Sequence, residues 1–164
     1  MDDLKKILIY AYGNPGRQDD GLGNRLIEKL EKWIDENNIC NVKLDSNYQL
    51  NIEDAVKISE KDMVIFVDAS TEQIEDIHFS PVEPSEGRTE FTTHAASPAF
   101  ILALCNKLYN KHPETYLLQI RGYEWEFKEE LSEKAEKNLE KALVFVKRVL
   151  GGCSGDGKNR PPRS

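Results

Sequence analysis

The chain alternates between short apolar runs and longer amphipathic stretches. Two continuous apolar runs, at residues 7–12 and 63–67, predict strands, and the second is apolar enough for burial on both faces of a parallel sheet. Weaker patterns predict three further strands, at residues 42–44, 77–82 and 116–120. Pro81 restricts the strand at 77–82 to an edge or an end, because proline cannot donate a ladder hydrogen bond.

Four other stretches have the three- and four-residue apolar spacing of amphipathic helices. They cover residues 22–36, 51–58, 99–108 and 131–150. Polar side chains predict the helix caps, which are Asp19 or Asp20 for the first helix, Asn51 for the second, and Ser97 followed by Pro98 for the third.

Strands that alternate with helices predict a three-layer α/β/α sandwich, with about five mostly parallel strands and helices on both faces. A chain of 164 residues is long enough to form one domain with a hydrophobic core. We place this single domain at residues 1–150. The glycine-rich residues 151–164 predict a flexible C-terminal tail.

Composition narrows the class of protein. The net charge of −7 argues against a nucleic acid as partner, because phosphate contacts need clustered lysine and arginine. The chain has no long apolar span and its start lacks the pattern of a secretory signal, so we expect no membrane association. Cys40, Cys105 and Cys153 form no CxxC pair or zinc spacing, which indicates a reducing, cytoplasmic setting. Cys105 lies in an apolar helical run and is interpreted as a core residue.

The turn after the first strand carries the most informative motif. Gly13-Asn14-Pro15-Gly16 interrupts the apolar run, and the carboxylates of Asp19 and Asp20 follow before the helix begins. Open parallel sheets bind ligands beyond the carboxyl ends of their strands. Paired carboxylates would repel a phosphate, and neither a G-x-G-x-x-G fingerprint nor a P-loop is present. The turn is therefore suited to a cation or to a partner that carries a metal.

Two further polar residues are expected at the same end of the sheet as Asp20. Asp68 comes directly after the strand at 63–67, and His94 lies in a polar loop before the helix start. In a parallel sheet Asp20, Asp68 and His94 would converge. Two carboxylates and an imidazole suit a divalent cation such as nickel or zinc and leave coordination positions free. Each residue also has a structural alternative: Asp19 and Asp20 as helix caps, Asp68 as an acceptor for loop amides, and His94 as a loop histidine.

Other candidate chemistry is weaker. His78 lies in the edge-strand pattern and His112 precedes Pro113 in a turn, so both are interpreted as surface residues. No G-x-S-x-G nucleophile elbow occurs, which argues against a serine hydrolase.

The chain resembles the hydrogenase maturation endopeptidases over roughly residues 6–150. Three motifs carry the resemblance: Gly13-Asn14 followed by Asp19-Asp20-Gly21-x-Gly23, the strand end Val67-Asp68-Ala69, and His94 shortly before Ser97-Pro98. In that family an acidic residue (Glu or Asp) at the Asp20 position, an aspartate at the Asp68 position and a histidine at the His94 position recognise nickel. The resemblance therefore implies catalytic and metal-binding roles for Asp20, Asp68 and His94, and contacts with the substrate for Gly13, Asn14 and Asp19.

The implied reaction is removal of a C-terminal extension from the large subunit of a nickel–iron hydrogenase after nickel has been inserted. Because the nickel belongs to the substrate, we expect no tightly bound cofactor in the protease. The implied partner is the large-subunit precursor, and we expect the protease to be a monomer. Many members of the family have a Gly-Gly-Thr-like loop after the second strand, where this chain has Asn47-Tyr48-Gln49-Leu50-Asn51. That difference bears on which hydrogenase is the partner.

Three other functions stay open at this point. A non-catalytic nickel-binding or hydrogenase-docking chaperone of the same fold would bind the precursor without shortening it. A small-molecule binder or metal-dependent hydrolase using the same crevice would hold a tight, stoichiometric metal. A flavodoxin-like nucleotide-binding module is disfavoured by Asp19 and Asp20.

Overall fold

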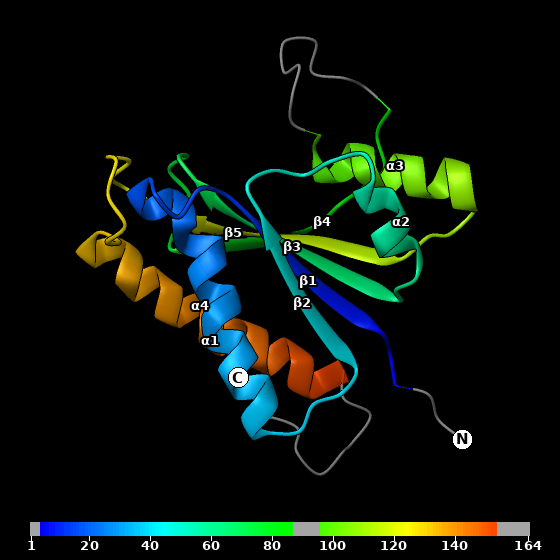
Figure 1. Cartoon of the computed structure of the whole chain (residues 1–164), viewed down its shortest axis with the longest axis horizontal. Helices are drawn as coiled ribbons and strands as arrows, with labels where there is room; N and C mark the ends of the chain where they lie inside the picture. Colours follow the sequence, from blue (N-terminus) through cyan, green and yellow to red (C-terminus); the bar gives the residue numbers. More distant parts are fainter. Residues whose placement is uncertain (1–3, 87–95, 154–164) are drawn as a thin grey trace.

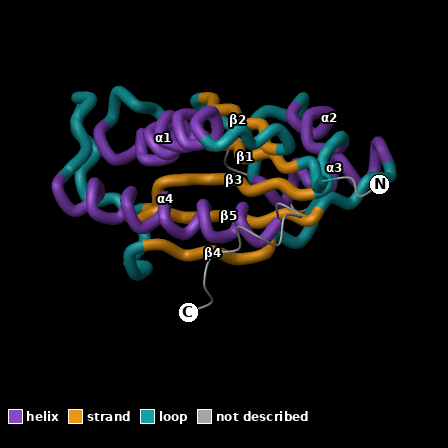
Figure 2. Tube along the Cα trace, turned by 90° about the horizontal axis from the view of Figure 1, so that it is seen from below, coloured by secondary structure: helices purple, strands orange, loops and turns teal. Residues whose placement is uncertain are grey.

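A computed structural model describes residues 4–86 and 96–153. Its five strands form one sheet in the order β2-β1-β3-β5-β4 (Figure 1). The strands are β1 (Ile7–Tyr12), β2 (Val42–Asn47), β3 (Met63–Ser70), β4 (Ile77–Pro81) and β5 (Glu114–Arg121). Neighbouring strands are parallel except for β4, which pairs antiparallel with β5. Figure 2 shows β4 at one edge of the sheet. The mostly parallel sheet with the Pro81 strand at an edge is confirmed.

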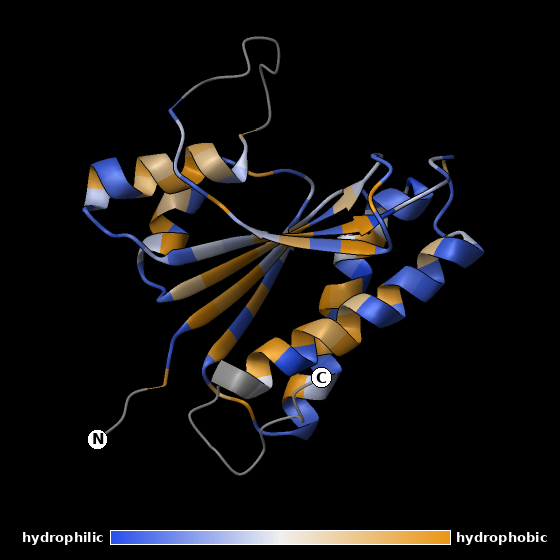
Figure 3. Ribbon diagram, turned by 180° about the vertical axis from the view of Figure 1, so that it is seen from behind, coloured by the Kyte–Doolittle hydropathy of each residue, from blue (hydrophilic) through white to orange (hydrophobic). Residues whose placement is uncertain are grey.

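Two helices cover each face of this sheet. Helices α1 (Leu22–Glu36) and α4 (Glu133–Cys153) pack on one face, whereas α2 (Asp54–Ser59) and α3 (Pro98–Tyr109) pack on the other (Figure 1). Because side chains alternate along a strand, Ile9 joins the core under α1 and α4, whereas Tyr10 joins the core under α2 and α3. Figure 3 shows apolar residues along the strands and alternating apolar and polar bands along α4, as expected for an amphipathic helix. The predicted three-layer sandwich is confirmed.

Two predicted boundaries are wrong. Asp68 does not end the central strand, because β3 continues through Ser70 while paired with β5. The predicted tail does not begin at Gly151, because α4 continues through Cys153. The remainder of that tail, residues 154–164, lies outside the described residues.

The helix caps agree with the sequence in one case of three. The Ser97 hydroxyl accepts a hydrogen bond from the N–H of Phe100 at 3.1 Å, which confirms the predicted start of α3. Asp19 and Asp20 do not cap α1, because they lie in a separate 3₁₀ helix, η1 (Gln18–Gly21), and α1 begins without a side-chain cap. Asn51 does not cap α2 either, since Glu53 occupies that position and makes no capping hydrogen bond.

Several surface and core assignments are also settled by the structure. Cys105 is buried and Cys40 is exposed, and both are free thiols. The side chains of His78 and His112 are exposed, as predicted. Within residues 4–86 and 96–153, none of the helices combines the length and the apolar character needed to cross a membrane.

Candidate functional site

The carboxyl ends of β1 and β3 define the candidate site. These strands are neighbours, yet the chain leaves β1 toward β2 on one side and leaves β3 toward β4 on the other. Open α/β sheets bind ligands at such a switch point, because the connections after the two strands diverge there. Pairing between β1 and β3 ends at Ala11 and Val67, and the next residues along the two strands are Tyr12 and Asp68.

Tyr12 and Asp68 interact where the two strands part. Both alternate with residues of the α1/α4 core, so they lie on the side of the sheet that α2 and α3 cover. The Tyr12 hydroxyl donates a hydrogen bond to the Asp68 carboxylate. Burial raises the pKa of Asp68 to about 7, with a further contribution from the nearby charge of Asp20, and the hydrogen bonds from Ala69 and Tyr12 only partly oppose this. Burial also raises the pKa of the Tyr12 phenol, which therefore stays a proton donor.

The raised pKa of Asp68 predicts a pH-dependent stability. The group stays protonated in the folded protein up to a pKa of about 7, whereas in the unfolded chain it ionises at its ordinary pKa of 3.8. Between these values the folded state binds more protons, so the free energy of unfolding should fall as pH rises from about 4 to 7 and level off above 7. A pKa difference of this size corresponds to about 2–4 kcal/mol.

Urea unfolding of the wild type and of Asp68→Asn between pH 4 and pH 8 measures this effect. The variant should lose that part of the pH dependence and should be the more stable of the two proteins at pH 8. Identical pH profiles would show that Asp68 does not take up a proton on folding.

Asp20 reaches the switch point from η1 through a tight turn. Its Oδ2 accepts a hydrogen bond from the N–H of Asn14 at 2.8 Å, and the Asn14 Oδ1 in turn accepts one from the N–H of Gly16 at 2.8 Å. Gly13 has φ of +150°, and a Cβ there would lie 2.2 Å from the carbonyl oxygen of Asp20. Glycine at this position therefore lets η1 close onto the end of β1. The contacts of Gly13 and Asn14 seen here lie within the protein, so their contacts with a substrate stay a prediction.

Asp19 has a different environment from its neighbour. Its side chain is 0% exposed, and its carboxylate accepts hydrogen bonds from three backbone N–H groups and one hydroxyl. The donors are the N–H groups of Tyr123 (2.7 Å), Glu124 (2.9 Å) and Ser132 (2.8 Å), and the Ser132 hydroxyl (2.7 Å). Both oxygens of this buried carboxylate already accept internal hydrogen bonds, and the predicted contact of Asp19 with a substrate stays a prediction. The carboxylate ties η1 to the segment between β5 and α4.

His94 lies outside the described residues, so the structure places two members of the predicted triad. Ala96, two positions further along the chain, packs against the core under α2 and α3, and its N–H donates to the carbonyl of Leu50 at 3.5 Å. Among the residues with described positions, no three His, Cys, Asp or Glu side chains are grouped so as to hold a metal ion. Asp20 lies close enough to Asp68 for its charge to raise the pKa of that carboxyl, and we call these two residues the carboxylate pair.

The loop after β2 borders the same edge of the sheet. The N–H of Gly13 donates to the carbonyl of Asn47 at 3.0 Å, which links the turn after β1 to the end of β2. Beyond this link the side chains of Tyr48 and Ile52 are 69% and 60% exposed. The loop therefore presents apolar surface near the carboxylate pair.

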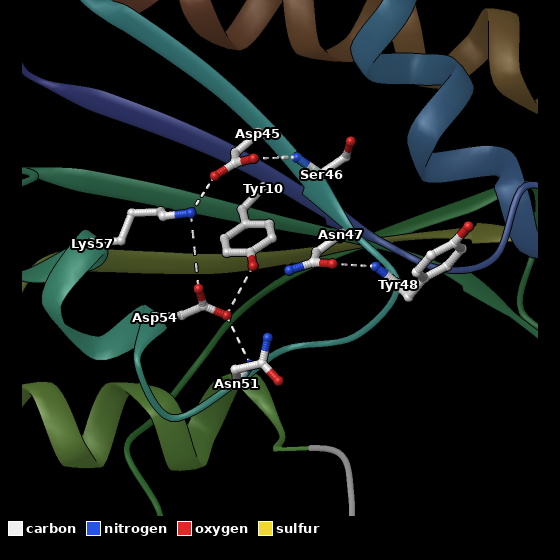
Figure 4. A network of polar contacts seen from close by, with 8 residues as sticks. All are labelled: Tyr10, Asp45, Ser46, Asn47, Tyr48, Asn51, Asp54 and Lys57. Carbon is white, nitrogen blue, oxygen red and sulfur yellow. Dashed lines mark hydrogen bonds and ion pairs between the residues drawn. The ribbon is translucent and has the colours of Figure 1, made fainter.

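A network of polar contacts lies beside this loop (Figure 4). The Tyr10 hydroxyl donates to Asp54 Oδ2 at 2.9 Å, and the N–H of Asn51 donates to the same oxygen at 2.8 Å. Lys57 forms ion pairs with Asp45 and Asp54. Figure 4 shows the Tyr48 side chain apart from these contacts, so the network fixes the backbone of the loop and leaves that ring exposed.

Comparison with solved structures defines the class of fold. No protein-family model and no curated protein sequence matches the chain. The hydrogenase maturating endopeptidase HybD from Escherichia coli has a TM-score of 0.68 at 20% identity, covering 92% of this chain and 94% of that one. For the NiFe hydrogenase maturation protease HycI from Thermococcus kodakarensis KOD1, the TM-score is 0.67 at 20% identity, with 91% and 94% covered. A hydrogenase 2 maturation peptidase from a Thaumarchaeota archaeon gives 0.63 at 20% identity, with 90% and 99% covered.

The chain is thus an α/β sandwich with a carboxylate pair at its switch point. Its fold is the one found in the hydrogenase maturation proteases. This agrees with the resemblance inferred from the three sequence motifs.

Sequence reasoning did not single out Tyr12. Its signal is positional, because it is the last residue of the first apolar run and lies an even number of positions from Tyr10 and Leu8, on the α2/α3 side of the sheet. A polar hydroxyl at the carboxyl end of a buried strand, one residue beyond the pairing with β3, is suited to contact the first polar residue of that neighbour.

Proposed function

We propose that this protein is an endopeptidase that removes the C-terminal extension from the nickel-loaded large subunit of a nickel–iron hydrogenase. The observation that carries the proposal is the proximity of the Asp20 and Asp68 carboxylates at the switch point of the sheet. The shared fold with hydrogenase maturation proteases supports it, although a fold by itself hosts many activities and the site must carry the argument.

In this proposal the nickel ion arrives bound to the precursor, and Asp20, Asp68 and His94 recognise it there. Carboxylate and imidazole groups are suitable ligands for Ni²⁺. Since the pKa of Asp68 is about 7 in the free protein, an approaching cation displaces its proton and then faces two carboxylates. A precursor without nickel offers no such compensation for the paired carboxylates, so cleavage becomes conditional on nickel.

The hydrolysis assigned to this site needs a base and an electrophile. Nickel held by the precursor can polarise the scissile carbonyl or lower the pKa of a bound water. One of the two carboxylates takes a proton from the water while the oxygen of that water attacks the carbonyl carbon. The C–N bond then breaks, and the proton passes to the amine of the departing extension. Tyr12 holds Asp68 in place through its hydrogen bond.

The partner in this proposal is the large-subunit precursor, and the protease is a cytoplasmic monomer with no tightly bound cofactor. Gly13 and Asn14 remain candidates for contact with the precursor backbone. The exposed Tyr48 in the loop after β2 is a candidate for selecting the partner hydrogenase.

The proposal is tested by incubating the purified protein with the unprocessed large subunit of a hydrogenase from the same genome, with and without inserted nickel. Intact mass should show C-terminal loss only in the nickel-loaded sample. Binding without mass loss would favour the non-catalytic chaperone function over the protease function. If the protein neither binds nor cleaves the precursor, this hydrogenase is not its partner and the proposed function loses its support.

A further inference from the structure

The segment between β5 and α4, residues 122–132, is fastened to the turn that carries Asp20. Besides the four hydrogen bonds to the Asp19 carboxylate, the N–H of Gln18 donates to the carbonyl of Lys128 at 2.7 Å. The Gln18 Oε1 accepts a hydrogen bond from the N–H of Glu126 at 2.9 Å. In Figure 1 the yellow segment lies beside the blue turn that follows β1. We call residues 122–132 the β5–α4 arm.

The arm exposes an aromatic side chain. Phe127 is 84% exposed, the largest exposed fraction among the large hydrophobic side chains in the described part of the chain. Arg17 lies over its ring, with the guanidinium carbon 4.8 Å from the ring centroid, and also donates to the carbonyl of Trp125 at 3.2 Å. The ring is therefore exposed on a backbone that is already ordered, so little conformational entropy is lost when a partner covers it.

The sheet order places the arm beside the carboxylate pair. In the order β2-β1-β3-β5, the arm follows β5, Asp68 lies on β3, Asp20 follows β1, and Tyr48 follows β2. Three strand spacings separate β2 from β5, or about 14 Å. A stable protein–protein interface covers about 800 Å² on each partner, a patch roughly 30 Å across. A partner surface of this size centred on Asp20 and Asp68 therefore also covers the ends of β2 and β5.

We infer that the β5–α4 arm is a docking element for the hydrogenase large-subunit precursor, with Phe127 as its anchor. The inference rests on the proposed function for the identity of the partner. Its support is the continuity of the arm with the turn that carries Asp20, together with the exposed and pre-ordered aromatic ring. Buried aromatic anchors dominate the binding energy of many interfaces.

The test compares Phe127→Ala with Tyr109→Ala in binding to the nickel-loaded precursor. Tyr109 is a matched control, because it is an exposed aromatic residue at the end of α3, shortly before β5 begins, and so lies toward the amino end of β5, opposite the end that the arm follows. Phe127→Ala should raise the Kd for the precursor about tenfold. Where cleavage is followed, KM should rise by a similar factor with kcat unchanged, because the ring lies outside the reacting groups. Phe127→Trp should restore binding, and Tyr109→Ala should bind as the wild type does.

The outcomes separate this inference from the proposed function. Normal cleavage by the wild type with an unchanged Kd in Phe127→Ala would overturn the docking role of the arm and leave the proposed protease function standing. Equal losses in Phe127→Ala and Tyr109→Ala would also overturn it. Loss of self-association in Phe127→Ala, with precursor binding unchanged, would assign the ring to a contact between two copies of the chain. If the wild type binds the precursor but does not cleave it, the protease function is rejected. The comparison of Kd values then still tests the docking role of the arm. Absence of any precursor binding by the wild type would overturn both.

Discussion

Alanine in place of Asp20 is expected to abolish processing of the nickel-loaded precursor and to leave the fold intact. The variant removes one of the two carboxylates at the switch point, and loss of a metal-recognising group should cost at least about 100-fold in processing rate. Its structural cost is small, because the side chain accepts one backbone hydrogen bond, from Asn14. Intact mass of the precursor measures processing, and thermal unfolding checks the fold. His94→Ala should give the same loss of processing.

Asp20→Glu is the matched control for charge. It keeps the carboxylate, and the resemblance to the maturation endopeptidases allows either acid at this position, so processing should persist. If Asp20→Ala or His94→Ala processed the precursor at the wild-type rate, that residue would have no part in nickel recognition. If Asp20→Glu were as inactive as the alanine variant, the geometry of the turn rather than the charge would decide activity.

Local pattern was enough to predict most of the fold. The apolar run at 7–12 and the amphipathic helix at 22–36 have the predicted bounds, because burial in the middle of a sheet and on one helix face leaves a periodic signal. Pro81 restricted its strand to an edge or an end, and β4 is an edge strand; its antiparallel direction was not predicted. The extension of β3 beyond Asp68 was not predicted, since it depends on pairing with β5, more than 45 residues away in sequence.

The candidate site could be predicted only in part, because two adjacent aspartates look the same in sequence. Asp20 and Asp19 differ through partners that lie 6 and 104–113 residues away, respectively. The first partner belongs to the turn and is visible as a glycine-rich motif. The partners of Asp19 belong to the β5–α4 arm, and no pattern in the sequence around Asp19 predicts them. For the same reason, the sequence suggested helix capping for both residues, whereas neither one caps α1.

Asp19→Ala is expected to be the most destabilising single substitution in this region. It leaves three backbone N–H groups and the Ser132 hydroxyl without their acceptor in the buried space between η1 and the β5–α4 arm. Unsatisfied buried donors cost about 1–3 kcal/mol each, and partial relaxation should hold the total to about 3–5 kcal/mol. For a domain of this size the midpoint of thermal unfolding should fall by roughly 10–15 °C.

Asp20→Ala, one position along the chain, is the control for this stability effect and should unfold within about 1 kcal/mol of the wild type. Asp19→Asn should remain destabilised, because the Oδ2 atom accepts three hydrogen bonds and the Oδ1 atom a fourth, so an amide NH₂ in either place would face a donor. The pair of variants therefore separates two roles that the sequence presents as one motif: Asp20 should govern processing without affecting stability, and Asp19 should govern stability and, through the arm, precursor binding. Wild-type stability in Asp19→Ala would mean that the arm is held by its remaining backbone contacts with Gln18, and the carboxylate would then have no structural role to explain its burial.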